Sequence, residues 1–330
     1  MSRAASNNRM ESNIMGVSNQ SILETFENIS VRLGGALDVS TARPISHAKF
    51  KERVIDSTIP YTIDGKKPSD DVVVLLSNAV FPDAVSNNVA KANLIDNLAG
   101  ENVGKRIASP LLEGRSGTQT WATYKRLRPI SDIRPINVCQ KYLATPKILA
   151  WCAELARETR KDWQDDTSYN KYFLAPLENL YADTDYPSEL REFAEFAHHE
   201  VLEKRPYLWT CVEHGDLWIG NVLFERSVTP LKSSFRGDFS VIDWGGSKDD
   251  GYPCADVVHL LSIMNRDNSK RSHKLLQDFR KSLNLSEFEV ALYTTLSIGQ
   301  LSLNLDHFPK QDFLALCEKT TRFLLGHKLI

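Results

Sequence analysis

Two short segments of the chain carry acidic and amide residues at a spacing that suits phosphoryl transfer. The first contains Asp216 and, five residues later, Asn221; the second ends in Asp243. In phosphoryl transfer a carboxylate must orient the attacking hydroxyl and accept its proton, and oxygen ligands must hold Mg²⁺ on the nucleotide phosphates. Asp216 can serve as the base, while Asn221 and Asp243 can supply the amide and carboxylate oxygens that Mg²⁺ accepts.

Both segments lie next to apolar runs that are typical of short strands. The first reads His-Gly-Asp-Leu-Trp-Ile-Gly-Asn over residues 214–221 and leads into Val222–Phe224, and the second follows Phe239–Ile242. Polar groups at such borders between strand and loop face outward from a rigid base. Any one of these residues alone is more often a cap or turn residue. The prediction therefore depends on the whole H-G-D-x4-N pattern, followed by V-I-D-W-G.

This pattern resembles the catalytic-loop motif of aminoglycoside phosphotransferases, choline and ethanolamine kinases, fructosamine kinases and homoserine kinases, which share the bilobal protein-kinase-like fold. The resemblance implies that Asp216 is the catalytic aspartate and that Asn221 and Asp243 are metal ligands. It also implies that His214 supports the loop and that Asp256, in G-Y-P-C-A-D-V-V-H-L-L, buttresses it from a following helix. Taken by itself, Asp256 is equally well a helix N-terminal cap.

The elements that must position these residues differ between the two ends of the chain. The N-terminal part reads as strand-rich, with strands over Val72–Leu76 and residues 118–128 and a helix over residues 83–99 between them. The C-terminal part has helical spacing, interrupted by strand-like residues 209–212 and 239–242. The helices are expected over residues 137–163, 171–182, 187–204, 254–265, 271–282, 286–303 and 311–326.

We therefore expect an α+β protein with a bilobal protein-kinase-like fold. A disordered tail would occupy residues 1–20, because this segment is rich in Ser and Asn and poor in apolar residues. A small β-rich N-lobe that binds the nucleotide would follow over residues 21–130. A larger, mainly helical C-lobe over residues 131–330 would hold the catalytic loop, the metal site and the acceptor site.

The N-lobe departs from the family in the residues that hold the nucleotide phosphates. Protein-kinase-like enzymes usually carry a lysine on the third strand, paired with a glutamate on the next helix. Residues 71–76 contain no lysine and residues 83–99 contain no glutamate. Since both partners are missing together, we expect a rearranged phosphate clamp. Candidate replacements are Lys49, Lys51, Lys125, Arg126 and Arg128, and Gly34–Gly35 is the nearest candidate for a glycine-rich phosphate loop.

Residues at the lobe junction are also predicted to contact the nucleotide. The candidates there are Arg126, Leu127 and Arg128. In the C-lobe, Trp151, Trp163 and Trp209 could stack on an acceptor, but filling the core is the stronger interpretation. The acidic residues between 137 and 205 are likewise read mainly as exposed helix faces.

Composition excludes other classes of function. A net charge of −2 gives no reason to expect nucleic-acid binding. No apolar run approaches the length that spans a bilayer, and the N-terminus lacks the continuous apolar segment of a signal peptide. The five cysteines are scattered, without a C-x-x-C pair. We therefore expect a cytoplasmic protein that binds no nucleic acid and inserts into no membrane.

The sequence thus favours a Mg²⁺-dependent phosphotransferase that moves the γ-phosphate of ATP or GTP to a hydroxyl of a small molecule. A sugar-like metabolite, an aminoglycoside or an amino alcohol would each fit as the acceptor. The alternative is a pseudokinase or binding scaffold with this fold and no turnover, which the missing lysine and glutamate support. A protein kinase acting on Ser or Thr is least favoured, because the loop reads H-G-D rather than H-R-D and no A-P-E segment follows.

Overall fold

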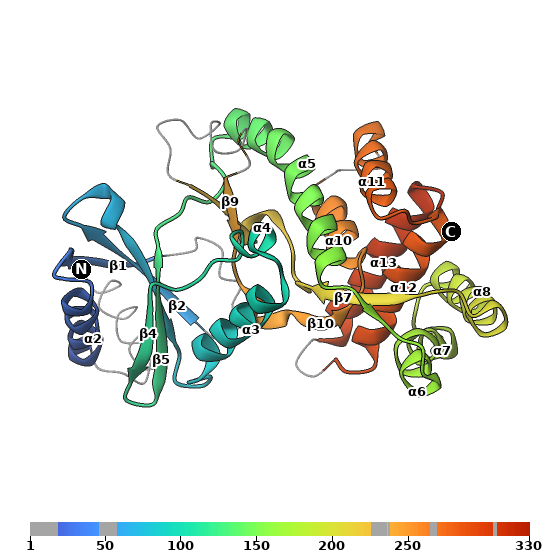
Figure 1. Ribbon diagram of the computed structural model, residues 1–330, viewed down its shortest axis with the longest axis horizontal. Coiled ribbons are helices and arrows are strands. Elements are labelled where there is room, and N and C mark those ends of the chain that lie inside the picture. The colour runs from blue at the N-terminus through green and yellow to red at the C-terminus, as the bar shows by residue number, and fades with distance from the viewer. Residues whose placement is uncertain (1–18, 46–57, 226–235, 237, 265–268, 306–308) are drawn as a thin grey trace, which may run out of the picture. The chain divides into compact units, whose positions relative to one another are not determined.

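The computed structural model describes residues 19–45, 58–225, 236, 238–264, 269–305 and 309–330 (Figure 1). The chain forms two compact units, each assembled from separate segments. The sheet unit contains Met1–Asp96, Lys105–Arg128 and Ser240–Gly245; the helical unit contains Asn97–Gly104, Pro129–Phe239 and Gly246–Ile330. Two of the candidate phosphate-binding residues, Lys49 and Lys51, lie outside the described residues, as do residues 1–18 of the predicted tail. The predicted domain boundaries at residues 20 and 130 stay predictions.

An antiparallel sheet forms the centre of the sheet unit. Its described strands lie in the order β1-β2-β3-β5-β4. In the β3–β5 register Val73 lies opposite Tyr124 and Leu75 opposite Ala122, so these four side chains share one face of the sheet. The strands are β1 (Leu37–Pro44), β2 (Thr58–Gly65), β3 (Val72–Ser77), β4 (Leu112–Ser116) and β5 (Gln119–Lys125).

One helix covers each face of this sheet. On one side α2 (Asn19–Arg32) buries Ile22, Phe26 and Ile29 in a core shared with the sheet residues Val72, Val74, Leu76 and Trp121. On the other side α3 (Ala84–Leu98) packs Val85 and Val89 against Ala122, Leu75 and Tyr124. The strand-rich interpretation of the N-terminal part overlooked α2. Its apolar residues at i, i+4 and i+7 are nevertheless the signature of a helix.

The Gly34–Gly35 pair ends helix α2 and precedes the first strand. Gly35 N–H donates to the Ser30 carbonyl at 2.8 Å and Gly34 N–H to the Val31 carbonyl at 3.0 Å. Both glycines have φ near +70°, the left-handed conformation that closes many helices. The pair therefore satisfies the last carbonyls of α2. This capping role explains the left-handed conformation of both glycines, so no phosphate-binding role is needed to account for it.

A distant segment of the chain completes the sheet unit. Strand β9 (Phe239–Val241) crosses into this unit, and Val241 forms a parallel bridge with Ile107. Val241 N–H donates to the Arg106 carbonyl at 2.6 Å, and Ala108 N–H donates to the Val241 carbonyl at 3.0 Å. These bonds fix the backbone just before Asp243.

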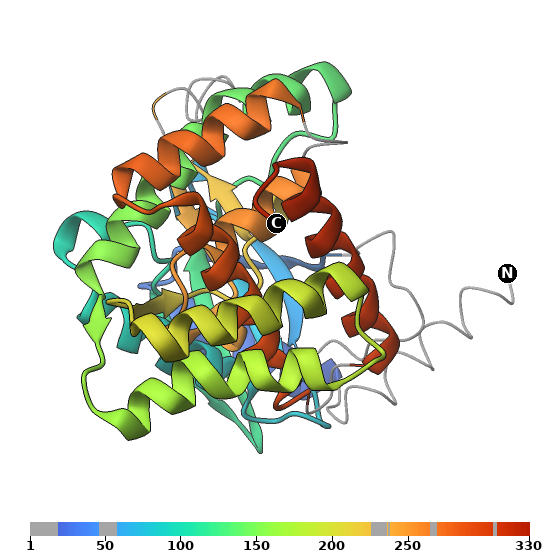
Figure 2. The ribbon, with the colours of Figure 1, turned by 90° about the vertical axis from the view of Figure 1, so that its right-hand side faces the viewer.

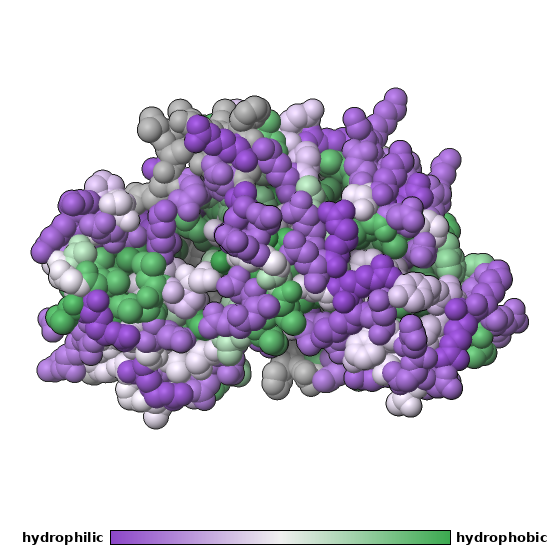
Figure 3. All heavy atoms as spheres, viewed as in Figure 1, coloured by the Kyte–Doolittle hydropathy of each residue, from purple (hydrophilic) through white to green (hydrophobic). Residues whose placement is uncertain are grey.

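Helices dominate the helical unit (Figures 1 and 2), where α7 packs against α8 and α12. Figure 3 shows a largely hydrophilic surface over the visible face of α8, as expected for a helix whose other face is buried. The described helices of this unit are α4 (Glu101–Gly104), α5 (Arg134–Glu158), α6 (Asp166–Tyr169), α7 (Ala175–Ala182), α8 (Ser188–Lys204), α10 (Ala255–Met264), α11 (Lys270–Ser282), α12 (Glu287–Ser302) and α13 (Lys310–Gly326).

Short strands lie among these helices and flank the segment with the H-G-D motif. They are β6 (Lys161–Asp162), β7 (Trp209–Glu213), β8 (Val222–Phe224) and β10 (Lys248–Gly251), with the order β10-β7-β6 in one small sheet. This architecture confirms the expected α+β class, with a β-rich N-terminal part and a larger, mainly helical C-terminal part. Among the described helices, none is both long enough and apolar enough to span a membrane.

Candidate functional site

A carboxylate on helix α10 holds the start of the catalytic loop, which we define as residues 214–221. The two oxygens of Asp256 accept hydrogen bonds from the backbone N–H groups of His214, at 2.6 Å, and Gly215, at 3.0 Å. Burial raises the pKa of Asp256 to about 6, and these two bonds act in the opposite direction because they favour the charged form. The residue predicted to support the loop thus lies where it bonds the loop backbone directly.

Glycine is required at the second position of this loop. Gly215 has φ of +81°, and a Cβ atom there would lie 2.7 Å from the Gly246 carbonyl oxygen. Any side chain would therefore meet both backbone strain and a close contact. The turn lets the buried His214 ring accept a hydrogen bond from the Asp216 N–H, with the Nδ1 atom 3.3 Å from the nitrogen.

Asp216 and Asn221 lie side by side in the catalytic loop. The amide nitrogen of Asn221 donates to the Asp216 carbonyl at 2.8 Å and to the Asp216 carboxylate at 3.3 Å. Asn221 is buried, whereas the side chain of Asp216 is 58% exposed. Because the amide nitrogen is bonded to Asp216, the amide oxygen of Asn221 points away from that residue. The loop thus presents one exposed carboxylate and one oriented amide oxygen.

His259 is a neighbour of Asp216 that sequence reasoning missed. Its Nε2 atom lies 3.8 Å from the Asp216 carboxylate. Burial, and to a smaller extent the nearby Lys319 and His214, lower the pKa of His259 to about 4. The imidazole is therefore neutral near pH 7. A signal was available, since His259 lies three residues after Asp256 and hence about one helical turn away.

In the sheet unit, Asp243 has a strained backbone and a fixed side chain. Its φ of +66° falls in the left-handed region, which costs a residue other than glycine about 1 kcal/mol or more. The Asn88 amide nitrogen donates to the Asp243 carboxylate at 3.0 Å, and Trp244 N–H donates to the Asn88 amide oxygen at 3.3 Å. Trp244 is buried, and its indole N–H donates to the Val241 carbonyl at 3.1 Å. Asp243 therefore stays exposed on a rigid support.

A lysine on helix α3 also contacts this segment. The Lys91 ammonium group donates to the Gly245 carbonyl at 2.6 Å. Lys91 and Asn88 are three residues apart, and they flank the buried face that Val85, Val89, Ala92 and Ile95 form. The sequence predicted a helix over residues 83–99 but assigned no role to its polar residues Asn88 and Lys91.

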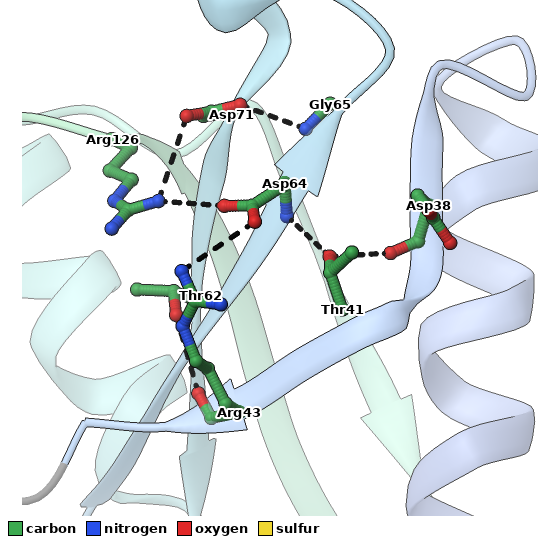
Figure 4. A network of polar contacts seen from close by, with 8 residues as sticks. All are labelled: Asp38, Thr41, Arg43, Thr62, Asp64, Gly65, Asp71 and Arg126. Carbon is green, nitrogen blue, oxygen red and sulfur yellow. Dashed lines mark hydrogen bonds and ion pairs between the residues drawn. The ribbon is translucent and has the colours of Figure 1, made fainter.

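Arg126, one of the residues predicted to contact nucleotide, joins strands of the sheet (Figure 4). One guanidinium nitrogen lies 2.9 Å from an Asp64 carboxylate oxygen and 3.6 Å from an Asp71 oxygen. The Arg126 N–H donates to the Asp71 carbonyl at 3.0 Å. The side chain of Arg126 is thus paired with two acids. Leu127 and Arg128 follow Arg126, which is the first residue after β5.

Four of the acidic residues between positions 137 and 205 have partners close by. Asp162 is paired with Arg160, Asp165 caps helix α6, Asp166 is paired with Arg205, and Asp185 is paired with Lys310. These ion pairs and this helix cap account for the positions of the four acids, so no cationic ligand is needed to explain them.

The three tryptophans of the same region are held by the protein itself. Trp151 and Trp209 are buried, and the Trp151 indole N–H donates to the Val103 carbonyl. Trp163 donates to the Thr210 hydroxyl and stacks on Tyr172. Trp218, in the catalytic loop, differs because it is 41% exposed.

Taken one by one, the predicted metal ligands are groups that suit magnesium better than a metal held entirely by protein ligands. Within the described part of the chain, no group of three or more His, Cys, Asp or Glu side chains is close enough to hold a metal ion. Magnesium is usually bound through one or two protein oxygens together with substrate phosphates and water. The exposed Asp243 carboxylate and the oriented Asn221 amide oxygen are ligands of that kind.

Comparison with known proteins gives structural likeness alone. No family model matches the chain, and no curated protein matches it. The chain is similar to the GDP complex of wild-type aminoglycoside 2'-phosphotransferase-IIIa, with a TM-score of 0.49 and 14% identity over 93% of this chain and 98% of the other.

Two further solved structures are similar to this chain. A putative fructosamine-3-kinase from Haemophilus somnus 129PT has a TM-score of 0.46 and 12% identity, over 88% of this chain and 92% of the other. A Plasmodium vivax ethanolamine kinase has a TM-score of 0.46 and 9% identity, over 88% and 85%. All three proteins are of kinds that the catalytic-loop resemblance named. Because the TM-scores lie below 0.5, the chemistry proposed below depends on this chain's own residues.

Proposed function

We propose that this protein is a Mg²⁺-dependent phosphotransferase that moves the γ-phosphate of ATP or GTP to a hydroxyl group of a small molecule. The observation that carries the proposal is the catalytic loop, where Asp256 holds the backbone, Asn221 bonds Asp216, and the Asp216 carboxylate stays exposed. A carboxylate held in this way can orient an acceptor hydroxyl and take its proton as the phosphoryl group leaves the nucleotide.

The proposal assigns a role to each residue of the predicted site. Asp216 accepts the proton, and His214 and Asp256 hold the loop. Asn221 and Asp243 are the proposed magnesium ligands, and the metal would offset the charge that develops on the transferred group. The strained φ of Asp243 supports its assignment, because such conformations persist mainly at functional sites. We propose that Leu127 and Arg128 contact the nucleotide base. The Arg126 side chain is paired within the sheet instead.

Within the proposed function, a neutral sugar-like acceptor fits the surroundings of Asp216 better than a polycation. The neighbour of the carboxylate supports this choice: His259, 3.8 Å from Asp216, is neutral, and the positive charge of Lys319 is among the causes that lower its pKa. Trp218, two residues after Asp216, offers an exposed ring on which a sugar could stack. Its indole lies over Gly220, where a Cβ would come within 2.2 Å of the ring.

Titration calorimetry with ATP and GTP, with and without Mg²⁺, tests the first part of this function. We expect Mg²⁺-dependent binding that Asp243→Ala weakens at least ten-fold, because one hard anionic ligand is lost. Asp278→Ala, which changes an exposed acid on α11, should bind like the wild type. Turnover is then measured on a panel of sugars, aminoglycosides and amino alcohols, where Asp216→Asn should lose at least a hundred-fold in kcat while keeping nucleotide affinity.

Two outcomes would contradict the proposal. Wild-type turnover retained in Asp216→Asn would remove Asp216 from the role of base. Absence of nucleotide binding in the wild type would favour the alternative, a binding scaffold with this fold, which the absence of a lysine from β3 supports.

A further inference from the structure

Strand β3 offers no positive charge to a nucleotide phosphate. The face of the sheet that α3 covers contains Val73 and Leu75 from β3, opposite Tyr124 and Ala122 from β5. Burial, together with the charges of Glu113 and Asp243, raises the pKa of Tyr124 to about 12, so this phenol stays neutral at physiological pH. The face where a lysine would be expected is thus lined by uncharged groups. A cation for the phosphates would therefore have to come from outside β3.

Lys91 of helix α3 places a cation beside the Asp-Trp-Gly segment (residues 243–245), which also contains the proposed metal ligand Asp243. Asn88 and Lys91 lie on one side of α3, and they bond consecutive parts of the Asp-Trp-Gly segment. Asn88 bonds the Asp243 carboxylate and the Trp244 N–H, and Lys91 bonds the Gly245 carbonyl. A Cβ at Gly245 would lie 3.6 Å from the Asn88 amide nitrogen and 3.9 Å from an Asp243 oxygen, so all four residues cluster closely.

The chemistry of this cluster suits the phosphate end of a nucleotide. A lysine ammonium has three N–H donors, so it can bond a backbone carbonyl and a phosphate oxygen together. Asn88 lies on α3, the helix that carries a glutamate in the usual arrangement. Unlike a glutamate, its amide adds no negative charge beside the phosphates. Both Lys91 and Asp243 are exposed, as contact with a ligand requires.

We propose that Lys91 of α3, placed by its bond to Gly245 and flanked by Asn88, is the cation that binds the nucleotide phosphates in place of a β3 lysine. The inference rests on the proposed function, because it assumes that Asp243 serves a nucleotide with its metal. It makes Lys91 a binding residue and Asn88 a positioning residue. The usual strand lysine and helix glutamate are thereby replaced by one helix that carries both partners.

The test compares binding of ATP, ADP, AMP and adenosine, and of the guanosine series, to the wild type and to Lys91→Met by calorimetry with Mg²⁺. We expect the dissociation constants for the triphosphate and diphosphate to rise by about ten- to hundred-fold in Lys91→Met. The rise should be smaller for AMP, and for the nucleoside it should stay below about three-fold, because the nucleoside has no phosphate to lose. Lys91→Arg should fall between the wild type and Lys91→Met.

Two controls separate a phosphate contact from a structural role. Lys67→Met removes an exposed lysine from the turn between β2 and β3 and should leave every dissociation constant unchanged. Methionine is a good helix former, so Lys91→Met should unfold at nearly the same urea concentration as the wild type. Asn88→Ala should weaken Mg²⁺-dependent binding of ATP more than Mg²⁺-independent binding, because it releases the Asp243 carboxylate.

The outcomes for this inference and for the proposed function can be told apart. Equal affinity of the wild type and Lys91→Met for ATP, or an equal loss for adenosine, would overturn the Lys91 assignment and leave the phosphotransferase proposal standing. Weak ATP binding by Lys91→Met in a protein with no turnover would support the assignment and contradict the phosphotransferase. Absence of nucleotide binding by the wild type would overturn both.

Discussion

At the scale of single residues, the structure explains why the catalytic loop reads H-G-D. Gly215 has a left-handed backbone, and the space that a side chain would need is filled by the Gly246 carbonyl. The glycine therefore brings His214 and Asp216 close enough for the ring nitrogen to accept the Asp216 N–H. The backbone conformation therefore requires glycine at position 215.

Gly215→Ala should therefore destabilise the helical unit and stop turnover. A left-handed alanine costs about 1 kcal/mol, and the close contact with the Gly246 carbonyl adds to that cost, so we expect a loss of about 1–3 kcal/mol in unfolding free energy. Urea denaturation measures it. Gly246→Ala is the matched control, since a Cβ there meets only an ordinary contact of 3.8 Å and φ is not positive. Similar losses in the two variants would contradict this account.

The sequence revealed the site residues that belong to a contiguous motif and missed those that do not. Asp216 and Asn221 share one contiguous motif, which is visible without a fold. Asn88 and Lys91 are ordinary polar residues of an amphipathic helix, and their partners lie about 155 positions later in the chain. Only the path of β9 beside Ile107 brings the two segments together.

At the scale of elements, α10 serves the catalytic loop with two side chains. Asp256, in its first turn, holds the backbone of His214, and His259, one turn later, lies beside Asp216. The helix thereby sets both the shape of the loop and the polarity around the proposed base. Because the His259 imidazole is buried in its neutral form, protonating it in acid should lower the stability of the fold around α10.

His259 should make the protein less stable in mild acid. Its folded pKa, about 4, is below the unfolded value of 6.5, so the unfolded chain binds a proton that the folded chain does not between these values. The contribution of neutral His259 is fully present above pH 6.5 and is lost as the pH falls toward 4, by about 1 kcal/mol per pH unit. The groups that set this pKa, besides burial, are Lys319 and His214, while Asp216 faces the ring from 3.8 Å.

Urea unfolding of His259→Gln between pH 4.5 and 7.5 checks this prediction. The variant should show a shallower loss of stability below pH 6.5 than the wild type. His199→Gln, which changes an exposed histidine on α8, should keep the wild-type slope. An unchanged slope in His259→Gln would show that other groups cause the acid sensitivity.

Element prediction succeeded where the hydrophobic period was strong. The sequence located β3, α3 and the long helices of the helical unit to within a few residues, apart from the end of α5. Strand β3 is a continuous run of Val and Leu, and α3 buries Val85, Val89, Ala92 and Ile95 at helical spacing. It overlooked β4, whose sequence LEGRS is polar. In the structure Gly114 of β4 lies against the Trp121 ring, and Arg115 is paired with Asp83, so β4 depends on contacts that its own residues do not reveal.

At the scale of the whole molecule, each unit needs residues that are far apart in sequence. The sheet unit closes one face of its sheet with α2, which comes before the first strand, and its last segment comes after most of the helical unit has been made. Its stability should therefore depend on α2 as much as on the strands. The N-terminal helix is part of the core of this unit.

Phe26→Ala should lower the unfolding free energy of the sheet unit by about 3–5 kcal/mol, because it removes a buried ring that packs on Tyr61. Leu23→Ala on the exposed side of α2 should change it by less than about 0.5 kcal/mol. Chemical denaturation followed by circular dichroism measures both variants. A small effect of Phe26→Ala would show that α2 is dispensable.

The bridge between Ile107 and Val241 has a consequence for how the protein is made. When Arg128 leaves the ribosome, all the described strands of the main sheet have been synthesised, but residues 240–245 have not. At roughly 5–20 residues per second, the ribosome needs roughly 6–23 seconds to supply them. During that time Ile107 lacks its strand partner, and Asn88 and Lys91 lack the Asp-Trp-Gly segment. The nascent sheet would thus emerge without Asp243, its proposed metal ligand, and the proposed nucleotide site would be completed only late in translation.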